Sequence, residues 1–240
     1  MSSTEFVIPA PPPISLPVLG ETKRFPVRRV FCVGRNYEEH AKEMGYTGRE
    51  PPFFFMKPAD TLVPIEAGRQ GTMNYPSLTQ NLHHEIELVV AVGVGGKNMS
   101  AAQAPAHIYG YAVGLDMTRR DLQNDMKKQG RPWEIGKSFE QSAPMGPVLP
   151  AAQWDQWAQS AGQKDAAIWL KVNGETRQTS HISQLIWNVG EILEHLSAAW
   201  ELAPGDLIFT GTPAGVAAVK SGDVLLGGVD GLPELNLKIV

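Results

Sequence analysis

The sequence predicts a strand-rich fold of the α+β class, with a mixed β-sheet and few helices. Short segments rich in β-branched and aromatic residues recur from residue 27 to the C-terminus, separated by glycine and proline turns. Only one segment has apolar residues at the i, i+3, i+4 and i+7 spacing of a long helix. Because strands and helices do not alternate along the chain, a wound βαβ sheet is the less favoured arrangement.

The individual elements follow from the same patterns. One or two helical turns are expected at Asn36–Met44, and the long helix is expected from Ser180 or His181 to about Ala199. Pro51–Pro58 is apolar but bounded by prolines, which predicts an edge strand or a covering loop. The other strands are expected at Val27–Val33, Glu85–Val92, Ile108–Thr118, Ala167–Asn173, Asp206–Phe209, Asp223–Leu226 and Leu235–Val240.

The domain organisation is expected to be simple. A chain of 240 residues fits one domain comfortably. The first residues are rich in proline and should run extended along a surface, so we expect an arm at 1–26 and a single catalytic domain at 27–240.

Composition excludes several classes of protein. With 21 basic and 25 acidic residues the formal net charge is −4, which argues against broad nucleic-acid binding. No apolar run approaches the roughly 20 residues that span a bilayer, and the N-terminus does not have the pattern of a signal peptide. Cys32 is the only cysteine and forms no intrachain disulfide, so the expected location is the cytoplasm.

The most informative stretch is His83-His84-Glu85-Ile86-Glu87. On a strand, Glu85 and Glu87 point to the same side, and the apolar residues that follow indicate that the strand enters the core. Asp116 ends another apolar strand, and three carboxylates suit Mg²⁺ or Mn²⁺ in a catalytic site. The alternative is that Glu85 and Glu87 form the hydrated face of a half-buried strand.

Candidate acid–base and anion-binding groups flank these carboxylates. His40 and Glu43 stand three residues apart, so on a helix the carboxylate can orient the imidazole as a general base; an ordinary surface contact is the alternative. Arg120 and Gln123 follow Asp116 closely and offer a cation and an amide, unless they belong to a solvated turn. Lys137 lies among apolar residues, where it either stabilises an oxyanion or pairs with an acid.

Taken together, these residues resemble the fumarylacetoacetate hydrolase family. The resemblance runs in order from about residue 27 to the C-terminus. Its motifs are Gly34-Arg35-Asn36-Tyr37 with His40 and Glu43, His84-Glu85-Ile86-Glu87, Gly110-Tyr111 leading to Asp116 and Arg120, Lys137-Ser138-Phe139, and Gly211-Thr212-Pro213. The proline-rich start, residues 51–58 and Arg131-Pro132-Trp133 resemble the short bacterial members that hydrolyse fumarylpyruvate in gentisate degradation.

This resemblance implies a roll-like mixed β-sheet, a homodimer, and Mg²⁺ or Mn²⁺ held by Glu85, Glu87 and Asp116. It also implies that His40 and Glu43 activate water on a lid over the substrate. The implied contacts with the substrate or its oxyanion are Arg120, Gln123, Lys137 and Thr212.

The implied activity is metal-dependent hydrolysis of the C–C bond of an acylpyruvate, with fumarylpyruvate giving fumarate and pyruvate. Arg49 and Lys57 are the candidates for binding a carboxylate at the far end of the acyl arm. Three alternatives remain open at this stage: oxaloacetate decarboxylation or tautomerisation, hydrolysis of maleylpyruvate, and a metal-binding domain without catalysis.

Overall fold

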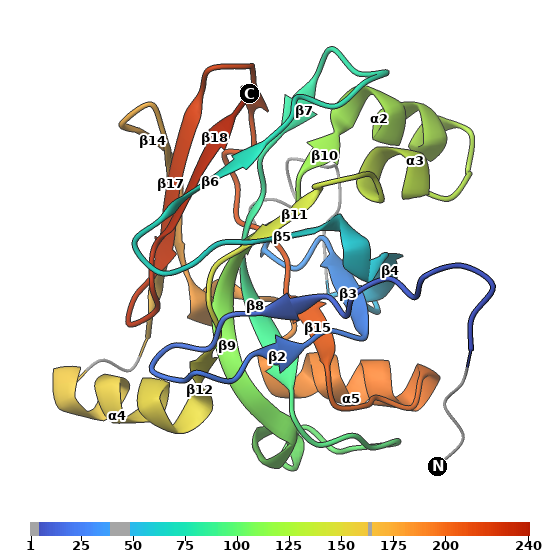
Figure 1. The fold of residues 1–240 in the computed structure, drawn as a ribbon. Helices are drawn as coiled ribbons and strands as arrows, with labels where there is room; N and C mark the ends of the chain where they lie inside the picture. Colours follow the sequence, from blue (N-terminus) through green and yellow to red (C-terminus); the bar gives the residue numbers. More distant parts are fainter. Residues whose placement is uncertain (1–4, 39–48, 163–164) are drawn as a thin grey trace.

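The computed structural model describes residues 5–38, 49–162 and 165–240 of the chain (Figure 1). Its largest sheet has the strand order β4-β3-β15-β8-β9-β11-β5, with β12 also paired to β9. The sheet is mixed, because β15 runs parallel to β3 and β11 parallel to β5 while the other pairs are antiparallel. Its strands are β3 (Arg29–Gly34), β4 (Phe53–Lys57), β5 (Leu62–Pro64), β8 (Ile86–Val92), β9 (Ile108–Leu115), β11 (Ala143–Met145), β12 (Leu149–Pro150) and β15 (Asp206–Phe209).

A second sheet of five strands packs against the first, in the order β14-β13-β17-β18-β6. Between the two sheets, Ile86 and Leu88 share one core cluster with Leu170, Leu225 and Leu237. The strands are β6 (Gln70–Met73), β13 (Ala167–Val172), β14 (Glu175–His181), β17 (Val224–Val229) and β18 (Leu235–Ile239). Two smaller ladders join β10 (Thr118–Arg119), β7 (Leu82–His83) and β16 (Ala218–Val219), and β1 (Ser15–Leu16) with β2 (Phe25–Pro26).

Strand β8 is buried on both faces, which explains its nearly unbroken apolar sequence. Ile86 and Leu88 point to the core between the sheets. Val89 and Ala91, on the side to which Glu87 also points, pack in a second cluster with Phe209. The curled sheet therefore places Glu87 inside the protein and not on a hydrated face.

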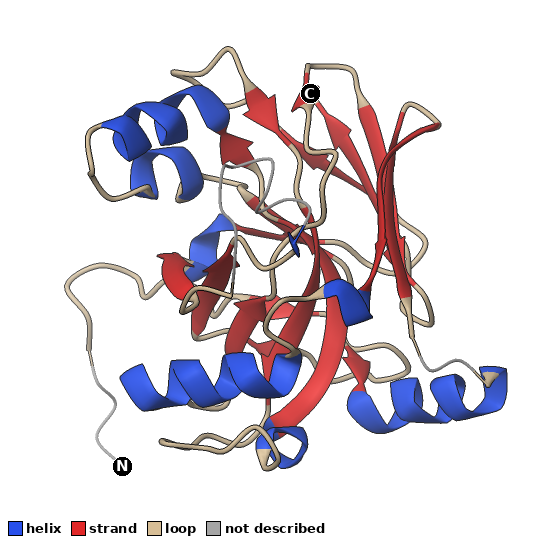
Figure 2. Ribbon diagram, turned by 180° about the vertical axis from the view of Figure 1, so that it is seen from behind, coloured by secondary structure: helices blue, strands red, loops and turns tan. Residues whose placement is uncertain are grey.

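The helices lie at two ends of the sheets (Figures 1 and 2). At one end are α2 (Arg120–Lys128) and α3 (Glu134–Lys137), and at the other are α4 (Ala151–Ala161) and α5 (Val189–Ala199). Short 3₁₀ turns are formed by η1 (Ala59–Thr61), η2 (Ala104–His107) and η3 (Ile182–Gln184). Among the described residues no helix is long and apolar enough to cross a membrane.

The predicted class, a strand-rich mixed sheet with few helices, is confirmed, and each expected strand is present within a few residues. Pro51–Pro58 forms an edge strand, since β4 pairs only with β3 in its sheet. The strand expected to reach Thr118 stops at Leu115, because Met117 donates instead to the carbonyl of Ser142.

The long helix was predicted wrongly in its first half. Residues 175–181 pair with β13, and the α-helix begins only at Val189. The Asn188 side chain caps it by accepting from Glu191 N, while the Glu191 carboxylate accepts from Asn188 N. This capping box starts the helix directly after Asn188, so the helix does not extend to the earlier residues that the apolar spacing alone favoured. Helices α2 and α4 were not predicted.

The proline-rich arm is more structured than expected. Ser15–Leu16 pairs with Phe25–Pro26, and Leu16, Val18 and Phe25 are buried in the cluster beneath β3. The division into an arm at 1–26 and a catalytic domain at 27–240 stays a prediction.

Candidate active site

Antiparallel pairing brings together three carboxylates that are distant in the sequence. Glu85 immediately precedes β8, and Asp116 immediately follows its partner β9. The ladder continues one step beyond the strands, where Asp116 N donates to Glu85 O at 2.9 Å. Candidate ligand atoms of Glu85, Glu87 and Asp116 all lie within 4.8 Å of one another. We call these three residues the acidic triad.

Burial makes the acidic triad unfavourable unless positive charge lies beside it. Glu85, Glu87 and Asp116 are only 5%, 2% and 1% exposed. Burial raises the pKa of Glu87 well above its usual value, and the charges of Asp116 and Glu85 raise it further. Such a set of buried hard oxygen donors fits a divalent cation such as Mg²⁺ or Mn²⁺, so the predicted hydrated-face alternative is wrong.

Lys137 enters the triad from the end of α3. Its ammonium lies 2.6 Å from Asp116 Oδ2 and 2.9 Å from Glu85 Oε2, and it donates to Thr118 Oγ1 at 2.8 Å. Burial alone would lower the pKa of Lys137, but the charges of Asp116 and Glu85 outweigh it and raise that pKa. Gly136 permits this approach, since an added Cβ there would lie 2.8 Å from the backbone nitrogen of Gln123.

Arg120 and Gln123 reach the triad from the first turn of α2. Arg120 forms an ion pair with Glu85 and donates to Gln123 Oε1 at 2.5 Å. Both side chains are buried, although the helix itself is polar. The alternative of a solvated turn therefore does not hold for these two residues.

Lys57 lies on the other side of Asp116. Its ammonium is 2.9 Å from Asp116 Oδ1, and it also donates to the backbone carbonyls of Met117 and Lys137 and to Ser142 Oγ at 3.1 Å. The side chain is 1% exposed, so these contacts leave it enclosed by protein.

Thr212 and the metal-ligand strand are joined by the amide of Gln178. Gln178 Nε2 donates to Thr212 Oγ1 and to the carbonyl of Pro213, both at 2.8 Å, so its Oε1 accepts from Ile86 N and His84 Nδ1. The Thr212 hydroxyl donates in turn to the carbonyl of Ile86 at 2.8 Å. Every hydrogen-bonding position of the Gln178 amide is used.

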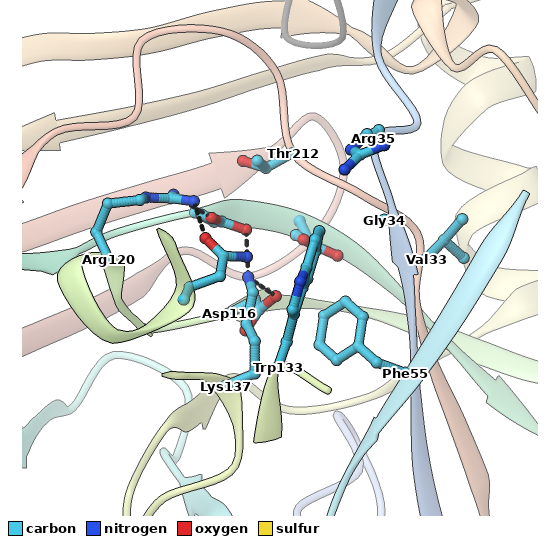
Figure 3. Close-up of a pocket in the computed structure, with 12 residues that line it drawn as sticks. Val33, Gly34, Arg35, Phe55, Asp116, Arg120, Trp133, Lys137 and Thr212 are labelled. Carbon is cyan, nitrogen blue, oxygen red and sulfur yellow. Dashed lines mark hydrogen bonds and ion pairs between the residues drawn. The ribbon is translucent and has the colours of Figure 1, made fainter. Parts of the chain in front are cut away.

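A small cavity of about 20 Å³ lies above the acidic triad (Figure 3). Arg35, Phe55 and Trp133 also form part of its wall. The residues expected from the sequence that line it are Glu85, Glu87, Asp116, Arg120, Gln123, Lys137 and Thr212. We call this space the triad cavity.

Of the four remaining predicted residues, the structure describes two, Arg49 and Lys57. His40 and Glu43 lie outside the described residues. Arg49 forms an ion pair with Glu191 at 2.5 Å and its guanidinium lies 4.0 Å from the Trp187 ring centroid. Neither Arg49 nor the enclosed Lys57 is among the residues that line the triad cavity, so their positions do not support the expected contact with a far carboxylate.

Comparison with known proteins identifies the family. The family described as fumarylacetoacetate (FAA) hydrolase C-terminal matches residues 29–240. The chain belongs to the fumarylacetoacetate hydrolase family. The resemblance predicted from the sequence motifs is therefore confirmed, and so is the mixed β-sheet roll that it implied.

Within the fumarylacetoacetate hydrolase family, the similar proteins include fumarylpyruvate hydrolases and an oxaloacetate tautomerase. The chain is 54% identical to fumarylpyruvate hydrolase from Pseudomonas aeruginosa, solved with Mn²⁺ and pyruvate, with a TM-score of 0.92 over 98% of this chain and 99% of that one. It is 46% identical over 190 residues to fumarylpyruvate hydrolase of a Ralstonia species, covering 79% of this chain and 93% of the relative. Mitochondrial oxaloacetate tautomerase FAHD1 of Rattus norvegicus is 39% identical over 212 residues, 88% of this chain and 91% of that protein.

Three residues around the site were not predicted as functional. Gln178 lies on an otherwise largely exposed strand, where no sequence pattern distinguishes it from a surface residue. Arg35 and Trp133 belong to motifs that were recognised, but only the fold shows that both reach the same cavity.

Proposed function

We propose that this protein is a metal-dependent hydrolase that cleaves the C–C bond of an acylpyruvate, with fumarylpyruvate giving fumarate and pyruvate. The buried acidic triad with Lys137 beside it carries this proposal. The relatives named as fumarylpyruvate hydrolases, at 46% and 54% identity, support the choice of substrate.

Glu85, Glu87 and Asp116 would hold the divalent cation, Mg²⁺ or Mn²⁺. When bound there, the cation supplies a Lewis acid that withdraws electron density from the substrate's oxygens. Two contacts keep the carboxylates of Glu87 and Asp116 in place. Gly211 N donates to Glu87 Oε2 at 2.7 Å, and the ammonium of Lys57 pairs with Asp116.

Lys137 is the group proposed to stabilise the developing oxyanion. Within the described part of the chain its ammonium donates only to side-chain oxygens, so it can turn toward a substrate oxygen without breaking a backbone bond. Gln123 offers an amide at the same cavity, and Arg120 and Thr212 line it from two further elements. Arg120 suits a substrate carboxylate, and the oriented Thr212 hydroxyl oxygen can accept a hydrogen bond.

The proposed general base is His40, oriented by Glu43, as the family resemblance implies. The imidazole removes a proton from water, and the resulting hydroxide attacks the distal carbonyl carbon of the acylpyruvate. The C–C bond then breaks with its electron pair on the pyruvyl fragment. Protonation of that fragment gives pyruvate, and the acyl fragment leaves as a carboxylic acid.

We further propose that the protein acts as a cytoplasmic homodimer in gentisate or other aromatic degradation. The single Cys32 is buried within β3 and needs no oxidising compartment, and the similar fumarylpyruvate hydrolases are bacterial. The net charge of −4 supports a small-molecule substrate and not a nucleic acid.

The decisive test follows the near-ultraviolet absorbance of enolised fumarylpyruvate with purified protein, first with Mg²⁺ or Mn²⁺ and then with EDTA. We expect metal-dependent loss of absorbance with pyruvate and fumarate formed in equal amounts. Glu87→Gln should abolish both metal binding and turnover, whereas Glu175→Gln, an exposed residue of β14, should change neither. No loss of absorbance in the metal-loaded protein would refute the assignment.

The tautomerase relative favours one second candidate, metal-assisted chemistry on oxaloacetate, for which activated water is unnecessary. His40→Ala separates the two functions. Acylpyruvate hydrolysis should collapse in that variant, whereas decarboxylation or tautomerisation of oxaloacetate should survive. Maleylpyruvate, assayed beside fumarylpyruvate, tests the remaining hydrolase alternative.

A further inference from the structure

We propose that a second cavity, adjoining the triad cavity, is the subsite for the acyl arm of the substrate, and that Arg35 selects an arm ending in a carboxylate. This proposal rests on the function proposed above. The cavity is lined by residues 53–55 and 131–134 together with Arg35, and we call it the acyl-arm cavity.

The sizes of the two cavities indicate how a substrate is divided between them. The triad cavity, at about 20 Å³, has room for a small polar group beside the carboxylates but not for a four-carbon arm as well. The acyl-arm cavity has about 390 Å³, within the range of small-molecule sites. Arg35, Phe55 and Trp133 line both, so the larger cavity adjoins the triad cavity at these three residues.

The walls of the acyl-arm cavity are aromatic. Phe53 and Trp133 meet edge to face at 5.0 Å between ring centroids, and Phe55 lies 6.3 Å from Trp133. Gly34 allows this packing, because an added Cβ there would lie 2.0 Å from Cζ of Phe53. Flat apolar walls of this kind suit a planar unsaturated chain.

Arg35 is the one positively charged residue among the three described residues that line both cavities. Figure 3 shows its side chain at the triad cavity. Its guanidinium carbon lies 5.1 Å from the Phe53 ring centroid and 5.5 Å from that of Trp133. The residue has a φ of 58°, a left-handed conformation that is strained for a non-glycine residue and that concentrates at functional sites. With this backbone conformation, the Arg35 side chain lies against Phe53 and Trp133 in the wall of the acyl-arm cavity.

The charge of the acyl-arm cavity favours an anion. Among the residues that the structure describes, its charged lining residues are Arg35, the exposed Arg131 and one acid, Glu134, so arginines outnumber acids there. A guanidinium forms bidentate hydrogen bonds with a carboxylate, so the cavity matches an unsaturated arm with a terminal carboxylate better than a neutral arm.

The experiment compares two ligands that differ only at this carboxylate: fumarate, and crotonate, in which a methyl group replaces it. Calorimetry on the Mn²⁺-loaded wild type should show that fumarate binds about 10- to 100-fold more tightly, since one charge-assisted pair is involved. Arg35→Gln should remove this preference and leave crotonate binding within about threefold. Arg177→Gln, an exposed arginine on β14, is the matched control and should keep the preference.

Kinetics provide an independent comparison. Arg35→Gln should lower kcat/KM for fumarylpyruvate about 10- to 100-fold while changing that for acetylpyruvate, which has no far carboxylate, by less than about threefold. Equal losses on both substrates would overturn the selective role of Arg35. So would equal binding of fumarate and crotonate by the wild type.

The two proposals fail in distinguishable ways. If the wild type hydrolyses neither acylpyruvate, the proposed function fails, while the fumarate preference and its loss in Arg35→Gln still decide whether the subsite exists. If Arg35→Gln does not give the wild-type circular dichroism spectrum, Arg35→Asn replaces it, because asparagine tolerates the positive φ of this position. This substitution should also remove the fumarate preference, and an unchanged preference would then overturn the proposal.

Discussion

Lys57 and Lys137 lie on opposite sides of the carboxylate of Asp116. Their surroundings differ, and the difference indicates a supporting role for Lys57 and a catalytic role for Lys137. Both are almost fully buried, at 1% and 2% exposure, and both pair with Asp116. Lys137 lines the triad cavity and bonds only to side chains, whereas Lys57 is enclosed and also bonds to two backbone carbonyls. A buried ammonium whose partners are side chains can turn toward a substrate oxygen. The ammonium of Lys57 is bonded to the backbone carbonyls of Met117 and Lys137, so its role is to support the chain there.

Among the substitutions that test this contrast, Lys137→Met should have the largest effect on turnover. Removing one donor to a developing oxyanion costs about 10²–10³ in kcat, and steady-state kinetics should show a loss of this size. Mn²⁺ affinity, measured by calorimetry, should remain, because the acidic triad is intact. The control is Lys128→Met, an exposed lysine of α2. A kcat near that of the wild type would show that Lys137 has no catalytic role. The proposed difference in role between Lys137 and Lys57 would then be wrong.

A smaller loss is expected for Gln178→Leu. The substitution releases the link between Thr212, Pro213 and the strand that carries Glu87, and the loss of such a supporting contact lowers activity or metal affinity about 10- to 100-fold. Kinetics and Mn²⁺ calorimetry should be measured together. Gln70→Leu, an exposed glutamine on β6, is the control. A loss of stability with unchanged kcat and Mn²⁺ affinity would show that Gln178 only supports the fold.

Lys57→Met should affect stability more than turnover. Breaking a buried ion pair typically costs about 3–5 kcal/mol, because the remaining charge is left without its partner. For a chain of this size we expect the thermal midpoint to fall by about 6–20 °C. Lys238→Met, an exposed lysine of β18, should leave the midpoint unchanged. A stable variant with a kcat as low as that of Lys137→Met would instead place Lys57 in the chemistry.

The smallest effect is expected for Arg49→Gln. Arg49 pairs with Glu191, but its side chain is 52% exposed, so the free energy of unfolding should fall by no more than about 1 kcal/mol. Urea denaturation measures this change. A loss of more than tenfold in kcat/KM for fumarylpyruvate, with no loss for acetylpyruvate, would restore the contact with the far carboxylate that the sequence analysis expected of Arg49.

Local patterns predicted most of the strands because their physical cause is local. Continuous apolar and β-branched content defines β8 and β9, alternation defines β13, and the apolar run after Glu87 correctly indicated entry into the core. The same kind of reasoning failed at residues 180–188, where apolar spacing predicted a helix but pairing with β13 and the Asn188 capping box determined the outcome. It also missed α2, whose sequence is polar although its buried face serves the site and not an apolar core.

The sequence by itself determined the family, the strand-rich class and the residue types of the site, since motifs and periodicity are properties of the chain. It correctly indicated that Glu85 and Glu87 lie together, although Glu85 stands just before the strand that carries Glu87. Only the tertiary structure decided that Asp116 lies against Glu85, that Lys57 and Lys137 take opposite sides of it, and that Arg35 and Trp133 share a cavity. These contacts join residues far apart in the chain. They depend on strand register and on how closely α3 approaches α2, which no local pattern encodes.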